Sequence, residues 1–148
     1  MDDRDEQIIR ILKWMKGEKP GPYSIEFYTD VGCNLFCKFC DTEIKPIKHL
    51  NMNHANKILD EAKDLGVKMV RVIGVGDPFL KKQEMTRFMT KIKEYGMFGF
   101  TVTNATVLGD DEVKQLVKIG WDEIRISLHG HNEEIHDYIT GKKGDFEM

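Results

Sequence analysis

Apolar residues along this chain recur at two spacings, and each spacing is typical of one kind of secondary structure. Apolar residues at every third or fourth position predict amphipathic helices. The stretches with this spacing are residues 5–16, 53–65, 85–95, 110–119 and 132–140. Short alternating or continuous apolar stretches predict β-strands, and they occupy residues 23–29, 69–73, 98–103 and 124–128. From the first strand onward, strand and helix therefore alternate.

That alternation predicts an α/β fold, in which parallel strands form one sheet and the helices pack on its face. We expect about four βα units, each with a right-handed connection. Gly17 and the run Pro20-Gly21-Pro22 end the helix that precedes them. We interpret residues 1–22 as an N-terminal helix and linker. The helix is expected to form a lid over one end of the sheet, and the alternative is a helix that binds a partner.

Composition narrows the class of protein without identifying it. The 148 residues are enough for one domain, so residues 23–148 are expected to share one core. Apolar residues make up 41% and charged residues 32%, which is ordinary for a soluble protein. The net charge of −3 gives no reason to expect a nucleic-acid partner. No apolar run is long enough to cross a membrane, so no membrane association is expected either.

All three cysteines lie within eight residues, directly after the first predicted strand. Cys33, Cys37 and Cys40 have the spacing C-x3-C-x2-C. Clustered cysteines without distant partners argue against a secreted disulfide framework, so we expect a cytoplasmic protein. Three thiolates this close can surround one metal centre. They would ligate three irons of a [4Fe–4S] cluster and leave the fourth iron open, whereas a structural zinc ion would need a fourth ligand such as His49 or His54.

The other predicted strands also run into polar or glycine-rich segments. These are Gly74-Val75-Gly76-Asp77-Pro78, Thr103-Asn104 and Ser127-Leu128-His129-Gly130. In parallel barrels the active groups lie at the carboxyl ends of the strands. We therefore expect these segments to gather around the cysteines at one end of the sheet.

The cysteine spacing resembles that of the radical S-adenosylmethionine (SAM) enzymes, and the aromatic Phe39 before the last cysteine fits the family pattern. The resemblance implies that Cys33, Cys37 and Cys40 ligate a [4Fe–4S] cluster, and that SAM chelates the open iron through its amino and carboxylate groups. It also implies that the reduced cluster cleaves SAM to a 5′-deoxyadenosyl radical. Phe39 would then lie near the adenine.

The resemblance continues in the segment after the second strand, which is similar to the family's glycine-glycine-glutamate-proline turn. By this resemblance, the Val75 carbonyl, Gly76 and Asp77 would face the amino group of SAM. Val75 replaces a glycine of the family pattern, and Asp77 replaces the usual glutamate. A turn in which Asp77 caps the following helix is the structural alternative.

The ends of the third and fourth strands resemble family segments as well. Asn104 would line the pocket or cap its own turn, while Ala105 stands where the family often has glycine. Ser127 would approach the carboxylate or ribose of SAM. His129 stands where the family often has aspartate, and it would approach the ribose as a hydrogen-bond donor or an acid–base group.

The family fold is a partial barrel of six βα units, so four units amount to a truncated or half radical-SAM partial TIM barrel. The fourth strand would then be an open edge, covered by a second copy or by a missing C-terminal half. The family resemblance implies a one-electron reductant of the flavodoxin or ferredoxin type. Residues 136–146 echo members with C-terminal cluster-binding extensions, which suggests a peptide or protein as the otherwise unknown substrate. The alternatives are a cluster- or zinc-binding module without turnover and a small iron–sulfur electron carrier.

Overall fold

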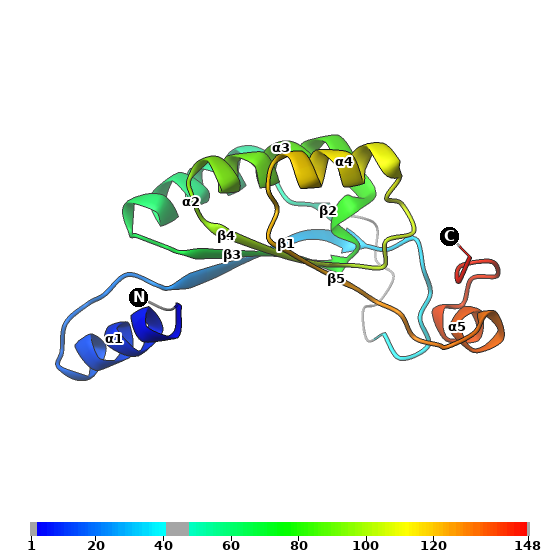
Figure 1. Cartoon of the computed structure of the whole chain (residues 1–148), viewed down its shortest axis with the longest axis horizontal. Helices are drawn as coiled ribbons and strands as arrows, with labels where there is room; N and C mark the ends of the chain where they lie inside the picture. Colours follow the sequence, from blue (N-terminus) through cyan, green and yellow to red (C-terminus); the bar gives the residue numbers. More distant parts are fainter. Residues whose placement is uncertain (1–2, 41–47, 148) are drawn as a thin grey trace.

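Five strands form a single sheet in the computed structural model, which describes residues 3–40 and 48–147 (Figure 1). The strand order is β2-β1-β3-β4-β5. The pairs β1–β3, β3–β4 and β4–β5 are parallel, and only the short β2 is antiparallel to its neighbour. The strands are β1 (Ser24–Gly32), β2 (Lys48–His49), β3 (Met69–Gly76), β4 (Phe98–Thr103) and β5 (Glu123–Ile126).

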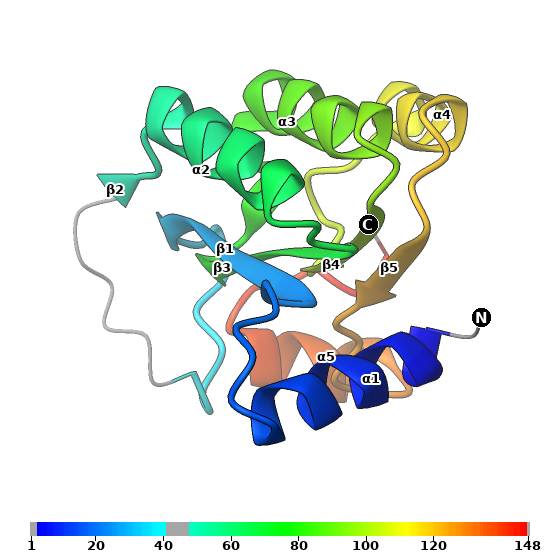
Figure 2. The same cartoon turned by 90° about the vertical axis from the view of Figure 1, so that its left-hand side faces the viewer.

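Three helices cover one face of the sheet and two lie on its other side (Figures 1 and 2). The covering helices are α2 (Met52–Asp64), α3 (Lys82–Glu94) and α4 (Asp110–Lys118). The helices opposite are α1 (Asp3–Met15) and α5 (Glu133–Thr140). A short 3-10 helix, η1 (Pro78–Lys81), leads from β3 into α3.

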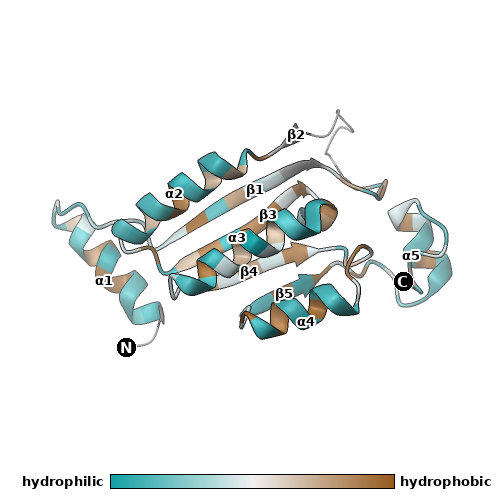
Figure 3. Cartoon of the chain, turned by 90° about the horizontal axis from the view of Figure 1, so that it is seen from above, coloured by the Kyte–Doolittle hydropathy of each residue, from teal (hydrophilic) through white to brown (hydrophobic). Residues whose placement is uncertain are grey.

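The core lies between the sheet and α2–α4. The sides of these helices turned away from the sheet are largely hydrophilic, coloured teal in Figure 3. Val70 and Val72 alternate inward on β3 and are fully buried. The Phe27 ring on β1 meets the Phe88 ring on α3 edge-on, with 4.9 Å between centroids. Burying each such side chain stabilises the fold by about 1.5–3 kcal/mol. The methionine-rich stripe of α3 is part of this core rather than a cofactor contact.

The opposite face of the sheet is polar and more open. Arg71 and Arg125 lie on either side of the Phe100 ring, with guanidinium-to-centroid distances of 5.0 and 4.8 Å. A cavity of about 470 Å³ separates this face from α1. Arg10 fixes α1 there by donating to the carbonyls of Pro22 and Gly66, so the helix lies near the residues at which β1 and β3 begin.

The predicted strands and helices are all present, and the α/β fold with four parallel strands is confirmed. The sequence did not predict β2 or η1, because two strand residues or one tight turn are too short for a periodic pattern. β5 lies at the sheet edge and leaves the Ile126 side chain 63% exposed. None of the helices in the described part of the chain is long and apolar enough to cross a membrane.

Candidate functional site

The carboxyl ends of β1, β3, β4 and β5 surround one pocket of about 440 Å³. This is the edge of the sheet at which the polar strand ends were predicted to gather. Every residue proposed for the site lines the pocket except Val75. Those that do are Cys33, Cys37, Phe39, Cys40, Gly76, Asp77, Asn104, Ser127 and His129.

The last turn of α5 holds the cysteine loop, which we define as residues 33–40. The backbone N–H groups of Phe36 and Lys38 donate to the carbonyls of Thr140 and Ile139, each at 2.9 Å. These are carbonyls that a helix end leaves without intrahelical partners. Contacts between distant parts of the sequence therefore shape the loop that carries the thiols.

The three thiols influence one another electrostatically. Burial raises the pKa of Cys37, and the nearby Cys33 and Cys40 sulfurs raise it further. Burial also raises the pKa of Cys33, against opposing hydrogen bonds from the Leu35 backbone and Asn104. Both shifts disfavour thiolates in the metal-free protein, and bound cationic iron would reverse that preference.

The donor set suits an iron–sulfur cluster better than a closed zinc site. Three sulfurs line the pocket, and of the other ligand types on its wall the Asp77 carboxylate accepts from Phe79, Thr103 and Asn104. The His129 ring rests edge-on against Phe39. Within residues 3–40 and 48–147, no group of three or more His, Cys, Asp or Glu side chains is arranged to hold a metal ion, and this includes the three cysteines, which share the pocket without being gathered around one point. His54 is exposed on α2 and does not line the pocket, and the side chain of His49 lies outside the described part of the structure.

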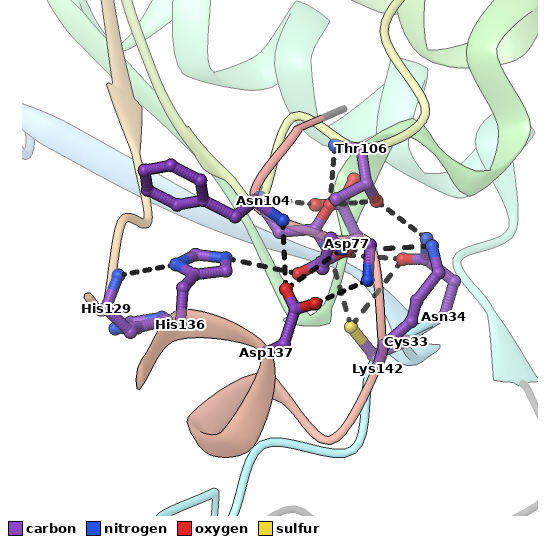
Figure 4. Close-up of polar contacts among 12 residues, drawn as sticks. Cys33, Asn34, Asp77, Asn104, Thr106, His129, His136, Asp137 and Lys142 are labelled. Carbon is purple, nitrogen blue, oxygen red and sulfur yellow. Dashed lines mark hydrogen bonds and ion pairs between the residues drawn. The ribbon is translucent and has the colours of Figure 1, made fainter. Parts of the chain in front are cut away.

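Asp77 organises the pocket wall from a buried position (Figure 4). Its Oδ2 accepts from the Thr103 hydroxyl at 2.7 Å and from the Asn104 backbone N–H at 2.8 Å. Its Oδ1 accepts from the Phe79 backbone N–H at 2.9 Å, which caps η1. The structural alternative considered for this aspartate, a cap at a helix start, is therefore present, and the side chain also ties β3 to β4.

Asn104 connects that wall to the cysteine loop. Its amide nitrogen donates to the Cys33 sulfur at 3.5 Å and to the Asn34 side chain at 3.1 Å, while its carbonyl oxygen accepts from Thr106 (Figure 4). Asn104 thus both lines the pocket and holds its own turn. The turn places Ala105 at φ 64°, a left-handed backbone that favours glycine, the residue that the family often has at this position. Asn34 and Thr106 were not predicted, because a single polar residue carries no periodic or spacing signal.

Gly76 lets β3 approach β1 closely at the pocket edge. A Cβ atom at Gly76 would lie 1.6 Å from the carbonyl oxygen of Gly32, its partner in the parallel register. The backbone of Asp77 then donates to the same Gly32 carbonyl at 3.0 Å. A side chain at position 76 would therefore force the two strand ends apart.

Ser127, His129 and Phe39 form the side of the pocket near α5. The Ser127 N–H donates to the Thr103 carbonyl at 2.9 Å, which fixes the end of β5. The His129 ring meets the Phe39 ring edge-on, with 4.7 Å between centroids. Burial lowers the pKa of His129, and the nearby His136 adds to the effect. A neutral imidazole therefore faces the pocket near neutral pH.

Known proteins with similar sequences belong to one superfamily of enzymes. The sequence model of the radical SAM superfamily matches residues 27–148. The chain is 30% identical over 131 residues to an AdoMet-dependent heme synthase from Methanosarcina barkeri, covering 85% of this chain and 36% of that protein. It is 29% identical over 115 residues to a probable GTP 3′,8-cyclase from Thermococcus kodakarensis, covering 76% and 36%.

Solved structures share the fold. SuiB of Streptococcus suis, bound to S-adenosylmethionine, superposes with a TM-score of 0.73 at 22% identity, covering 97% of this chain and 34% of that one. SuiB bound to the precursor peptide SuiA gives the same TM-score at 20% identity, covering 97% and 33%. The chain spans about a third of the length of these proteins.

Proposed function

Since the chain belongs to the radical SAM superfamily, we propose that its pocket binds a [4Fe–4S] cluster and SAM for radical chemistry on a substrate. When bound, the reduced cluster supplies one electron that cleaves SAM to a 5′-deoxyadenosyl radical, which abstracts hydrogen from that substrate. The family uses this cluster and this cofactor. The observation that carries the proposal is that three mutually interacting thiols share one pocket with the ends of four strands.

We assign Cys33, Cys37 and Cys40 as the cluster ligands. The Asn104 amide contacts the Cys33 sulfur and would tune the cluster from outside its ligand set. The fourth iron would face the pocket, because this sequence has no fourth cysteine and His129, the histidine that lines the pocket, rests its ring against Phe39.

We assign the β3 end to the amino group of SAM. Backbone carbonyls near Val75 and Gly76 can accept from an ammonium, and the absence of a side chain at Gly76 leaves them reachable. The Asp77 carboxylate lines the pocket, but its hydrogen bonds go to Phe79, Thr103 and Asn104. Asp77 would act mainly by holding this segment and by adding negative charge near the ammonium.

The remaining pocket residues fit the rest of the cofactor. The Ser127 hydroxyl would donate to the carboxylate or ribose of SAM, and the His129 imidazole would reach a ribose hydroxyl. Phe39 has a ring that is 62% exposed and available to the adenine. Phe39 comes from the loop after β1, and Ser127 and His129 come from the segment after β5, so these side chains lie at the carboxyl ends of strands, as active groups on parallel sheets do.

For the substrate we propose a peptide or protein. The support is the likeness to SuiB, which has been solved with its precursor peptide SuiA. A one-electron reductant of the flavodoxin or ferredoxin type would supply electrons in the cytoplasm. The exposed edge of β5 would be covered by a second copy or by further barrel strands.

The discriminating experiment is anaerobic reconstitution of the chain with iron and sulfide. We expect four irons per chain, an EPR signal that changes when SAM is added, and production of 5′-deoxyadenosine with a reductant. A cluster whose EPR signal does not change when SAM is added would instead support the electron-carrier alternative. SAM binding without 5′-deoxyadenosine would support a module that lacks turnover.

Matched variants separate the cluster from a zinc site. Cys37→Ala should abolish cluster assembly, because only three protein ligands hold it. His54→Ala should leave iron content and EPR unchanged, since His54 lies outside the pocket. Binding of one zinc ion that depends on His54 would refute the cluster assignment.

A further inference from the structure

The segment after β5 folds around one buried imidazole, that of His136, which is 4% exposed. Its Nδ1 lies 3.2 Å from the backbone nitrogen of His129 (Figure 4), and its Nε2 lies 3.2 Å from Oδ2 of Asp145. Asp145 is equally buried. A polar pair this deep needs a structural or functional reason, because burying polar groups costs free energy unless they are paired.

The contacts define the protonation of His136. The backbone N–H of His129 can only donate, so Nδ1 must be the unprotonated, accepting nitrogen. Nε2 then carries the hydrogen and donates it to Asp145. Asp145 thereby selects one tautomer of His136, and that tautomer is the one able to hold the His129 backbone.

Asp145 is itself fixed in place by the turn around it. The Asp137 carboxylate accepts from the backbone N–H groups of Gly144, Asp145 and Phe146. Lys142 places its ammonium 3.6 Å from Oδ1 of Asp145. Neither member of the pair can move without disturbing several hydrogen bonds.

The pair connects directly to the pocket. The His129 ring, whose backbone it holds, rests against Phe39 at the pocket wall. The same helix, α5, holds the cysteine loop through the carbonyls of Ile139 and Thr140. Gly130 allows the close approach, because a Cβ atom there would lie 2.5 Å from the backbone nitrogen of His136.

We propose that His136 and Asp145 are positioning residues, which fix the His129 backbone so that its imidazole stays against Phe39 and contacts SAM. This inference rests on the proposed function of the pocket. His136 does not touch the cofactor itself. It acts through His129, and Asp145 acts through the tautomer of His136.

Two substitutions separate the two nitrogens of His136. In His136→Asn, the side-chain oxygen can take the place of Nδ1 and still accept from His129, while the contact with Asp145 is lost. In His136→Gln, the amide nitrogen can take the place of Nε2 and still donate to Asp145, while the acceptor for His129 is lost. Both variants remove one buried hydrogen bond, so a purely structural role would affect them similarly.

The reconstituted variants are compared by iron content, by the SAM-induced EPR change and by the dissociation constant for SAM. We expect both to keep their clusters. His136→Gln should bind SAM about tenfold more weakly, the effect of losing one ordinary hydrogen bond, while His136→Asn stays within about twofold of the wild type. Equal SAM affinity in both variants would overturn the positioning role.

A second measurement needs no cluster and remains available if a variant fails to fold. Nitrogen-15 NMR of the metal-free wild-type protein should show an unprotonated Nδ1 and a protonated Nε2 at His136, and the His129 amide resonance should show a hydrogen-bonded shift. A protonated Nδ1 would overturn the inference. If SAM leaves the EPR signal of the wild-type cluster unchanged, the proposed function is refuted, and the SAM-positioning role with it. The NMR result would still test the hydrogen bonds that His136 makes with His129 and Asp145.

Discussion

Asn104 donates its side-chain amide to the Cys33 sulfur across 3.5 Å, and so joins the end of β4 to the first cysteine of the loop. The contact matters because a hydrogen bond to a cluster sulfur stabilises the more negative, reduced state. Asn104→Ala should therefore lower the reduction potential of the cluster without reducing iron content. A redox titration followed by EPR measures this change. Thr106→Ser keeps the hydroxyl that Asn104 contacts and should leave the potential unchanged.

Asp77→Ala should destabilise the fold strongly. The substitution leaves the Thr103 hydroxyl and the backbone N–H groups of Asn104 and Phe79 without their acceptor. We expect a loss of about 2–4 kcal/mol in the free energy of unfolding, measured by urea denaturation. The exposed Asp64 provides the control, and Asp64→Ala should change that free energy by less than about 0.5 kcal/mol. A mild effect of Asp77→Ala would contradict the structural role.

Gly76→Ala should impair SAM binding more than cluster assembly. The added methyl group would meet the Gly32 carbonyl and displace the β3 end that we assign to the SAM amino group. We expect an increase of at least about tenfold in the dissociation constant for SAM, equivalent to about 1.4 kcal/mol. Gly109→Ala is the comparison, because there the new Cβ meets only the flexible end of Glu112. Unchanged SAM affinity in Gly76→Ala would argue against the assignment of β3.

Ala105→Gly should stabilise the protein. Ala105 has a positive φ, and a left-handed backbone costs a residue with a Cβ about 1–2 kcal/mol. Since glycine also loses more entropy on folding, we expect a net gain of about 0.5–1 kcal/mol. The same substitution in the buried interior of α2, Ala55→Gly, should instead cost about 1 kcal/mol or more. Thermal unfolding of the two variants provides the measurement, and a shift in the same direction would contradict the backbone argument.

His129 should titrate below the ordinary histidine pKa of about 6.5 in the metal-free protein. The unfolded chain then binds more protons than the folded one between the folded and the unfolded pKa. Stability consequently falls as the pH drops below about 6.5 and is regained as it rises. Proton NMR gives the midpoint, and His129→Gln should remove this part of the pH dependence. A midpoint above the ordinary value would show that burial does not dominate at this site.

The sequence predicted the pocket because its cues were local: a strand pattern followed directly by cysteines, glycines or polar residues. Parallel strands bring such ends to one edge, so no tertiary information was needed to place Ser127 near Cys33. The direction of the Asp77 carboxylate could not be predicted, because it depends on Thr103, a residue of another strand. The pairing of His136 with Asp145 was missed because it also depends on how the chain folds back on itself. Both residues lie in the stretch 136–146, which resembles a segment of some family members.

The order of synthesis separates the three cysteines from the helix that holds their loop. The thiols are made early, yet the backbone of their loop is held by Ile139 and Thr140, which are synthesised much later. A nascent chain can therefore present three sulfurs long before it can present them in a fixed arrangement. Iron delivery is expected to follow synthesis of α5, so the cellular assembly machinery would meet a chain in which all the strands of the sheet have already been made.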